Sequence, residues 1–118
     1  MAKLLLVDDD ADLAETLADL FSMLDHEVHV FGEGGPALEA MNAGQFDLIL
    51  LDWQLPDMQG VDVCKRYRDA GGQSRILMLT GMRDAASRDA GRAAGADDFL
   101  IKPFTLDQIT QRLEAMLG

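Results

Sequence analysis

Six side chains that can do chemistry come directly after short apolar runs of this sequence. They are Asp8, Asp9 and Asp10 after the first run, Asp52 after the third, Thr80 after the fourth and Lys102 after the fifth. A single Asp in such a place is usually a turn former or a helix cap, and Asp10 fits that role. Asp8, Asp9 and Asp52 brought together would repel one another and raise at least one pKa. A hard divalent cation relieves that repulsion, and carboxylates, a backbone carbonyl and waters suit Mg²⁺.

Asp52 is the candidate nucleophile in this set, because a carboxylate can attack phosphorus and Asp52 ends a predicted central strand. Transfer of a phosphoryl group mainly requires that its charge be neutralised and its geometry fixed. A metal ion would do this on one side, and Lys102 would pair with a phosphoryl oxygen on the other. Thr80 would donate a hydrogen bond to a third oxygen. The backbone N–H of Gly81 can approach closely, since glycine has no Cβ.

The elements that must position these residues alternate along the whole chain. Short runs rich in β-formers predict strands over residues 4–7, 27–31, 48–51, 76–79 and 99–101. A stretch with helical spacing follows each of them. Such alternation indicates βαβ units around a parallel sheet, with right-handed crossovers and helices on both faces. Ligands of open α/β sheets bind beyond the carboxyl ends of the strands, which is where the six side chains fall.

Helix boundaries and buried faces also follow from the spacing. The first helix is expected to bury Leu13, Leu17, Leu20, Phe21 and Leu24. The second opens at Gly35-Pro36, with Pro at the first helical position, and closes at residues 42–44. The third covers residues 61–68. Asp84 caps the fourth, which runs to Ala94, and Thr105 with Gln108 has capping-box spacing for the last. The buried face of that last helix is expected to comprise Leu106, Ile109, Leu113 and Met116 or Leu117.

Composition excludes several classes of function. The chain has 118 residues, which suits one domain over residues 1–118. A net charge of −11 with scattered Lys and Arg argues against direct nucleic-acid binding. One cysteine allows no intrachain disulfide and suits a reducing compartment. No apolar stretch approaches the roughly 20 residues that span a bilayer, so no membrane association and a cytoplasmic location are expected.

Four motifs together resemble the receiver domain of two-component response regulators. They are LLVDDD at residues 5–10, LLDWQLPDMQG at 50–60, LTG at 79–81 and DDFLIKPF at 97–104. Each is weak alone, but all four in this order and spacing are highly specific, and the resemblance runs from Leu4 to Leu117. It implies an α/β fold of the flavodoxin-like class: a three-layer sandwich of five βα units around a parallel sheet of order 2-1-3-4-5.

The resemblance also implies a role for each site residue. Asp52 is the phosphoacceptor, Asp9 binds Mg²⁺ (or Mn²⁺) directly, and Asp8 does so largely through water. Gln54 supplies its backbone carbonyl to the metal. Thr80, Gly81 and Lys102 bind the phosphoryl oxygens, and the peptide bond between Lys102 and Pro103 is cis.

Signalling is the activity that the resemblance implies, through Thr80 and the aromatic residue Phe99. Thr80 moves toward the phosphoryl group, Phe99 turns inward, and the face of the fourth helix, fifth strand and fifth helix shifts. The small residues of the fourth helix fit either a weakly held helix or close packing on the sheet.

The resemblance also implies the partners: the donor is a histidine kinase or histidine phosphotransfer protein, and an output partner or effector domain receives the signal. The chain catalyses only its own phosphorylation and slow dephosphorylation. Phosphorylation-dependent pairing of two copies through the same face, with ion pairs of Asp97, Asp98 and Arg112, is a further expectation.

Three rival functions fit the residues less well. A phosphatase of the haloacid dehalogenase type also uses Asp and Mg²⁺, but its motif after the first strand ends in Thr or Val, and the sequence VDDDAD at residues 7–12 does not match it. A pseudo-receiver that only binds partners would lack some of the five site positions, which are intact here. A flavodoxin needs hydroxyl-rich residues after its first strand, whereas Asp8 and Asp9 would repel a phosphate.

Overall fold

Five parallel strands form the central layer of the structure, and their order across the sheet is β2-β1-β3-β4-β5. The computed structural model describes all 118 residues. The strands are β1 (Lys3–Val7), β2 (Glu27–Phe31), β3 (Leu48–Asp52), β4 (Arg75–Thr80) and β5 (Asp98–Ile101). Both the strand order and the alternation of strands and helices were predicted from the sequence, and both are confirmed.

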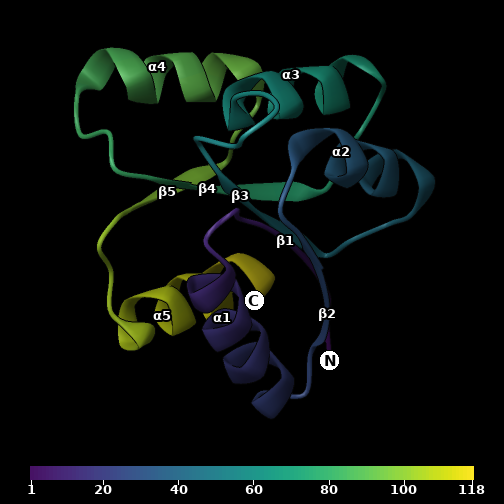
Figure 1. Cartoon of the computed structure of the whole chain (residues 1–118), viewed down its shortest axis with the longest axis vertical. Helices are drawn as coiled ribbons and strands as arrows, with labels where there is room; N and C mark the ends of the chain where they lie inside the picture. Colours follow the sequence, from purple (N-terminus) through teal and green to yellow (C-terminus); the bar gives the residue numbers. More distant parts are fainter.

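Five helices cover the two faces of this sheet. They are α1 (Ala11–Met23), α2 (Gly34–Ala43), α3 (Gly60–Asp69), α4 (Ala85–Ala94) and α5 (Leu106–Leu117). Helices α1 and α5 lie on one face, and α2, α3 and α4 lie on the other (Figure 1). None of these helices combines the length and the apolar character that crossing a lipid bilayer would require.

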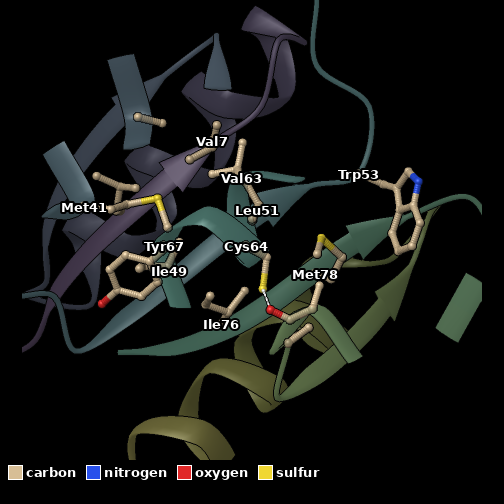
Figure 2. Packing of buried hydrophobic residues seen from close by; sticks show 14 of the residues in the cluster. Val7, Met41, Ile49, Leu51, Trp53, Val63, Cys64, Tyr67, Ile76 and Met78 are labelled. Atoms are coloured by element: carbon tan, nitrogen blue, oxygen red, sulfur yellow. Dashed lines mark hydrogen bonds between the residues drawn. The ribbon is translucent and has the colours of Figure 1, made fainter. Parts of the chain in front are cut away.

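The two faces of the sheet carry separate apolar cores. Leu4 and Leu6 of β1 pack toward α1 and α5, whereas Leu5 and Val7 pack toward α2 and α3. This division follows from the alternation of side chains along a strand. Figure 2 shows the second core, with side chains of α2 and α3 around those of the central strands. Strand β2 forms one edge of the sheet and is partly exposed.

Helix caps largely follow the sequence. Asp10 and Asp84 accept a hydrogen bond from the third residue after them, and Thr105 and Gln108 form a complete capping box. One boundary differs, since α2 begins at Gly34 and Pro36 is its third residue rather than its first. Proline is tolerated there because that position lies in the first turn, where the backbone N–H lacks an intrahelical partner.

Two leucines assigned to buried helix faces lie outside the core. Leu24 is 39% exposed and Leu106 is 48% exposed. Leu24 follows the last residue of α1, and Leu106 is the first residue of α5, so neither lies on the packed turns of its helix. The other predicted residues of the last helix, Ile109, Leu113 and Met116, are buried.

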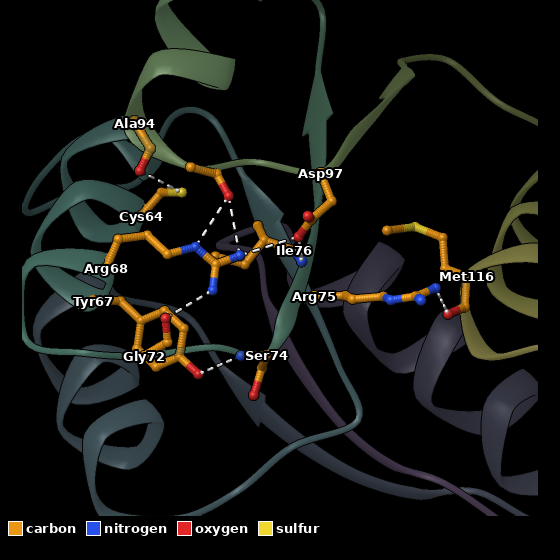
Figure 3. A network of polar contacts seen from close by, with 11 residues as sticks. Cys64, Tyr67, Arg68, Gly72, Ser74, Arg75, Ile76, Ala94, Asp97 and Met116 are labelled. Carbon is orange, nitrogen blue, oxygen red and sulfur yellow. Dashed lines mark hydrogen bonds and ion pairs between the residues drawn. The ribbon is translucent and has the colours of Figure 1, made fainter.

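Arg68 near the end of α3 connects two loops at the amino ends of the strands (Figure 3). Its guanidinium donates to the carbonyl oxygens of Gly95 and Gly72 and to the carboxylate of Asp97. Asp97 also accepts a hydrogen bond of 2.8 Å from the backbone N–H of Ile76 in β4. The C-terminal end of α4 is therefore fastened to α3, where the Cys64 thiol also donates to the Ala94 carbonyl at 3.3 Å.

Candidate functional site

The predicted site residues meet at the carboxyl edge of the sheet. Asp8 and Asp9 follow β1, Asp52 ends β3, Thr80 ends β4, and Lys102 follows β5. An open cavity of about 390 Å³ is lined by Asp9, Asp52, Trp53, Gln54, Thr80, Gly81, Met82 and Lys102. A larger cavity of about 700 Å³ lies at the ends of α2 and α3, and no charged side chain lines it.

Three carboxylates converge at this cavity. One oxygen from each of Asp8, Asp9 and Asp52 can be chosen so that all three lie within 4.8 Å of one another. Asp8 and Asp52 are buried, whereas Asp9 is exposed to solvent. A set of hard oxygen donors this close together fits a hard divalent cation, since only a positive charge relieves their repulsion. The donors present therefore match Mg²⁺ or Mn²⁺.

The pKa of the Asp52 carboxyl is raised by its surroundings in this cavity. Burial, followed by the negative charge of Asp8, raises its pKa to about 6, although the charge of Lys102 opposes the change. Burial disfavours the ionised form of a carboxylate, and a neighbouring carboxylate adds to this effect. At neutral pH Asp52 remains ionised, which is the form that a nucleophile or a metal ligand needs.

Lys102 is the cation that compensates the two buried carboxylates. Its Nζ donates to Asp8 Oδ2 at 2.9 Å and lies 3.4 Å from Asp52 Oδ1. Burial by itself would lower the pKa of Lys102, but the hydrogen bond and charge of Asp8 outweigh it and raise that pKa. The peptide bond between Lys102 and Pro103 is cis, as the resemblance implied.

Thr80 and Gly81 form the wall of the cavity at the end of β4. Thr80 is buried, and its Oγ1 accepts a hydrogen bond of 2.9 Å from the backbone N–H of Met82. Gly81 is exposed, and a Cβ built there would meet no atom within 4 Å. The backbone at Gly81 is thus accessible to a group that enters the cavity.

Gln54 belongs to a closed loop between β3 and α3. It pairs with Gln59 in an isolated antiparallel bridge, and the N–H of Gly60 donates to the Trp53 carbonyl at 2.6 Å. The base of the loop is therefore fixed directly after Asp52. Gln54, whose backbone carbonyl is the predicted metal ligand, lines the same cavity.

Phe99, the predicted switch residue, lies under α4. Its side chain is buried against Gly91, and the guanidinium of Arg92 lies 5.6 Å from the ring centroid. Trp53 is also buried beside Gly91, and it lines the cavity as well. The buried residues of α4 are Gly91 and Ala94, and most of its alanines are exposed. Few side chains thus hold this helix on the sheet. Of the two interpretations of its small residues, this favours a weakly held helix over close packing.

Two residues with structural roles were missed from the sequence, Asp57 on the site side of the sheet and Arg68 at the opposite end of the sheet. Asp57 accepts hydrogen bonds from the first two backbone N–H groups of α2, and Arg68 holds the end of α4. The partners of Asp57 lie 22 and 23 positions earlier in the chain, so no local pattern identifies them. The one available signal was the lack of a capping residue before Gly34. The acidic groups proposed for pairing between copies, Asp97 and Asp98, bond to Arg68 and Arg112 within the chain.

Comparison with known proteins places this arrangement in context. The family model for the response regulator receiver domain matches residues 4–114. The response regulator MprA of Mycolicibacterium vanbaalenii is 36% identical over 115 residues, covering 98% of this chain and 50% of that protein. The response regulator ArlR of Staphylococcus saprophyticus is 33% identical over 117 residues, covering 99% and 53%. This chain therefore spans about half the length of these relatives.

Solved structures agree with the sequence relatives. The chemotaxis response regulator CheY4 of Vibrio cholerae superposes with a TM-score of 0.92 at 30% identity, covering 99% of each chain. The receiver domain of Francisella response regulator 1452 gives a TM-score of 0.93 at 26% identity, covering 99% of this chain and 97% of that one. The flavodoxin-like arrangement predicted from the motifs is therefore confirmed.

Proposed function

Because this chain belongs to the response regulator receiver domain family, we propose that Asp52 accepts a phosphoryl group in a two-component signalling pathway. The observation that carries the proposal is the position of Asp52, which is buried beside Asp8 and 3.4 Å from the Lys102 ammonium. A buried carboxylate with a cation beside it and an open cavity before it is suited to nucleophilic attack.

The metal that this site requires is Mg²⁺ or Mn²⁺. Asp9, Asp52 and the Gln54 carbonyl would hold it, and Asp8 would contribute through water. When bound, the ion neutralises negative charge on the entering phosphoryl group. The closeness of the Asp8, Asp9 and Asp52 oxygens supports this assignment. Lys102 is the cation that pairs with these carboxylates, and one positive charge does not balance three negative ones.

The residues of this chain account for the transfer step. A carboxylate oxygen of Asp52 forms a bond to phosphorus while the bond from phosphorus to the donor's imidazole nitrogen breaks, and the electron pair stays on that nitrogen. Lys102 exchanges its contact with Asp52 for a phosphoryl oxygen, and Thr80 with the Gly81 N–H donates to others. A histidine kinase or histidine phosphotransfer protein is the proposed donor. Beyond this step and slow hydrolysis, we propose no catalysis.

The output of phosphorylation is a shift between two arrangements of Thr80 and Phe99. Thr80 Oγ1 now accepts a hydrogen bond from Met82, and turning its hydroxyl toward a phosphoryl group would break that bond. The ring of Phe99 is already buried under Gly91. Phosphorylation would therefore stabilise an inward ring position that exists beforehand, which is a population shift. The face of α4, β5 and α5 would then present this state to an output partner, an effector domain or a second copy.

Titration with Mg²⁺ tests the metal site directly. Trp53 is the single tryptophan and lines the cavity, so its fluorescence is expected to change in a saturable way as Mg²⁺ is added. Asp9→Asn and Asp52→Asn should abolish the response. Asp10→Asn is the matched control, because it removes a neighbouring charge while Asn still caps α1. A flat titration of the unmodified protein, or an unchanged one for Asp52→Asn, contradicts the proposal.

A further inference from the structure

Helix α2 begins without a capping side chain of its own. Glu33 occupies the N-cap position in an extended conformation, and its side chain makes no capping hydrogen bond. Pro36 has no N–H, and the N–H of Ala37 already donates to the Glu33 carbonyl. The N–H groups of Gly34 and Gly35 are therefore the two donors at this helix start that need a partner.

Asp57 provides that partner from a distant part of the chain. Its Oδ1 accepts from the Gly34 N–H at 2.7 Å, and its Oδ2 accepts from the Gly35 N–H at 2.7 Å. These two backbone hydrogen bonds lower the pKa of Asp57, so its carboxylate stays ionised at neutral pH. Both oxygens of one carboxylate are thus used to join two segments.

The contact fits closely around the helix start. A Cβ at Gly34 would lie 2.6 Å from Cγ of Met58, the residue next to Asp57. Only glycine allows the loop to approach α2 this closely. The loop therefore has a packed contact as well as a polar one with the first turn of α2.

Asp57 lies in the loop that follows the phosphoacceptor. The base of this loop is closed by the Gln54–Gln59 bridge and by the hydrogen bond from Gly60 to Trp53. The residues between the two ends of that bridge contact the rest of the molecule through the carboxylate of Asp57 and through the side chains of Leu55 and Met58, which pack against the core. Gln54, at the start of the same loop, lines the cavity.

We propose that Asp57 is a positioning residue for the metal site: by fastening the 54–59 loop to α2, it holds the Gln54 carbonyl in place for the cation. This inference rests on the proposed function, because it assigns Gln54 to the metal. It differs from a plain capping role for Asp57, in which only the stability of α2 would depend on the carboxylate. Outer groups that orient metal ligands directly typically change metal affinity 10–100-fold, and Asp57 acts through a loop, so an effect at or below the lower end of that range is expected.

Two variants separate the positioning role from the capping role. Asp57→Ala removes both contacts and should weaken Mg²⁺ binding by about threefold to tenfold in the Trp53 titration, besides lowering Tm. Adding Glu33→Asp gives α2 a local cap without restoring the loop contact. The double variant should recover Tm in part while its Mg²⁺ affinity stays low. Asp57→Asn keeps one acceptor and should give an intermediate affinity.

A matched loss of a helix cap elsewhere provides the control. Thr105→Ala removes the side-chain cap of α5 and should lower Tm without changing Mg²⁺ affinity. The inference is overturned if folded Asp57→Ala or Asp57→Asn binds Mg²⁺ as tightly as the unmodified protein. It is equally overturned if Glu33→Asp restores the affinity, or if Thr105→Ala weakens it to the same extent. Absence of Mg²⁺ binding by the unmodified protein would instead remove the proposed function and this inference with it.

Discussion

The Phe99 ring lies directly against the backbone of Gly91 in α4. A Cβ at position 91 would lie 2.6 Å from Cε1 and 2.9 Å from Cζ of that ring, and 3.3 Å from Cζ3 of Trp53. The residue assigned to the switch is therefore in contact with the helix whose surface is assigned to the output. The absence of a side chain at Gly91 is what allows the ring to be buried there.

Replacement of Gly91 by alanine tests this contact through the sign of the change in stability. In an unpacked helix position, alanine is favoured over glycine by about 1 kcal/mol. Here the added methyl group overlaps ring carbons, and overpacking of a core typically costs about 1–3 kcal/mol. We expect the free energy of unfolding, measured by urea denaturation, to decrease in Gly91→Ala.

The control for this variant lies on the same helix. Asp89→Ala changes an exposed residue and should leave stability unchanged or raise it slightly, since alanine is the better helix former. An increase in stability for Gly91→Ala of the size given by helix propensity would show that Phe99 does not need the space.

The pKa of Asp52 predicts a pH-dependent difference in stability between Asp52→Asn and the unmodified protein. The pKa of Asp52 is about 6 in the folded protein, whereas the ordinary pKa of an Asp side chain is 3.8. The stabilisation from the protonated group is thus fully present below about pH 4 and is lost as pH rises through about 6. Without Mg²⁺, Asp52→Asn should be more stable by about 1–3 kcal/mol at pH 7.5.

The measurement is urea denaturation of both proteins at a series of pH values in the presence of EDTA. Since other carboxylates titrate in both proteins, the difference between the two unfolding free energies is the informative quantity. It should be near zero at pH 4 and grow toward pH 7. A difference that stays constant across this range would show that burial does not raise the pKa of Asp52.

Arg68 is expected to contribute more to the stability of the fold than a typical surface arginine does. Its guanidinium satisfies the carbonyl oxygens of Gly72 and Gly95 and pairs with Asp97. Arg68→Ala removes the donor from the two carbonyl oxygens, and leaving such acceptors without a partner typically costs about 1–3 kcal/mol. Arg66→Ala, an exposed neighbour on α3, should change Tm little. Equal Tm values for the two variants would contradict the assigned role.

Lys102 is expected to be needed for switching but not for holding the metal. Lys102→Ala removes the cation next to Asp8 and Asp52 but leaves the Asp9 and Gln54 ligands unchanged. We expect this variant to bind Mg²⁺ in the Trp53 titration. The further change produced by beryllium fluoride, which mimics a phosphoryl group, should be lost. A normal response to beryllium fluoride would refute the role given to Lys102.

Much of the fold could be predicted because its signals are local. The buried runs of β1 and β3, the caps at Asp10 and Asp84, and the capping box at Thr105 each lie within a few residues. The gathering of the site residues also followed from the sequence, since parallel strands bring their carboxyl ends to one edge. The errors at Leu24 and Leu106 arose because apolar spacing does not show where a helix leaves the packed layer.

Contacts between distant segments could not be predicted in the same way. Asp57 and Gly34 are 23 positions apart, and nothing near either residue identifies the other. From the sequence alone, Gly91 is a residue of low helix propensity within a helix. Only the folded structure shows that Phe99 occupies the space beside it. The pKa of Asp52 likewise depends on burial and on Asp8, which the fold brings together.

The most direct test of the central claim is phosphorylation of the protein by a small phosphodonor such as acetyl phosphate. The protein is incubated with the donor and Mg²⁺, and its intact mass is recorded. A single phosphoryl adduct is expected for the unmodified protein, and none when EDTA is present or in Asp52→Asn. No adduct on the unmodified protein, or an equal adduct on Asp52→Asn, would contradict the assignment of Asp52 as the phosphoacceptor.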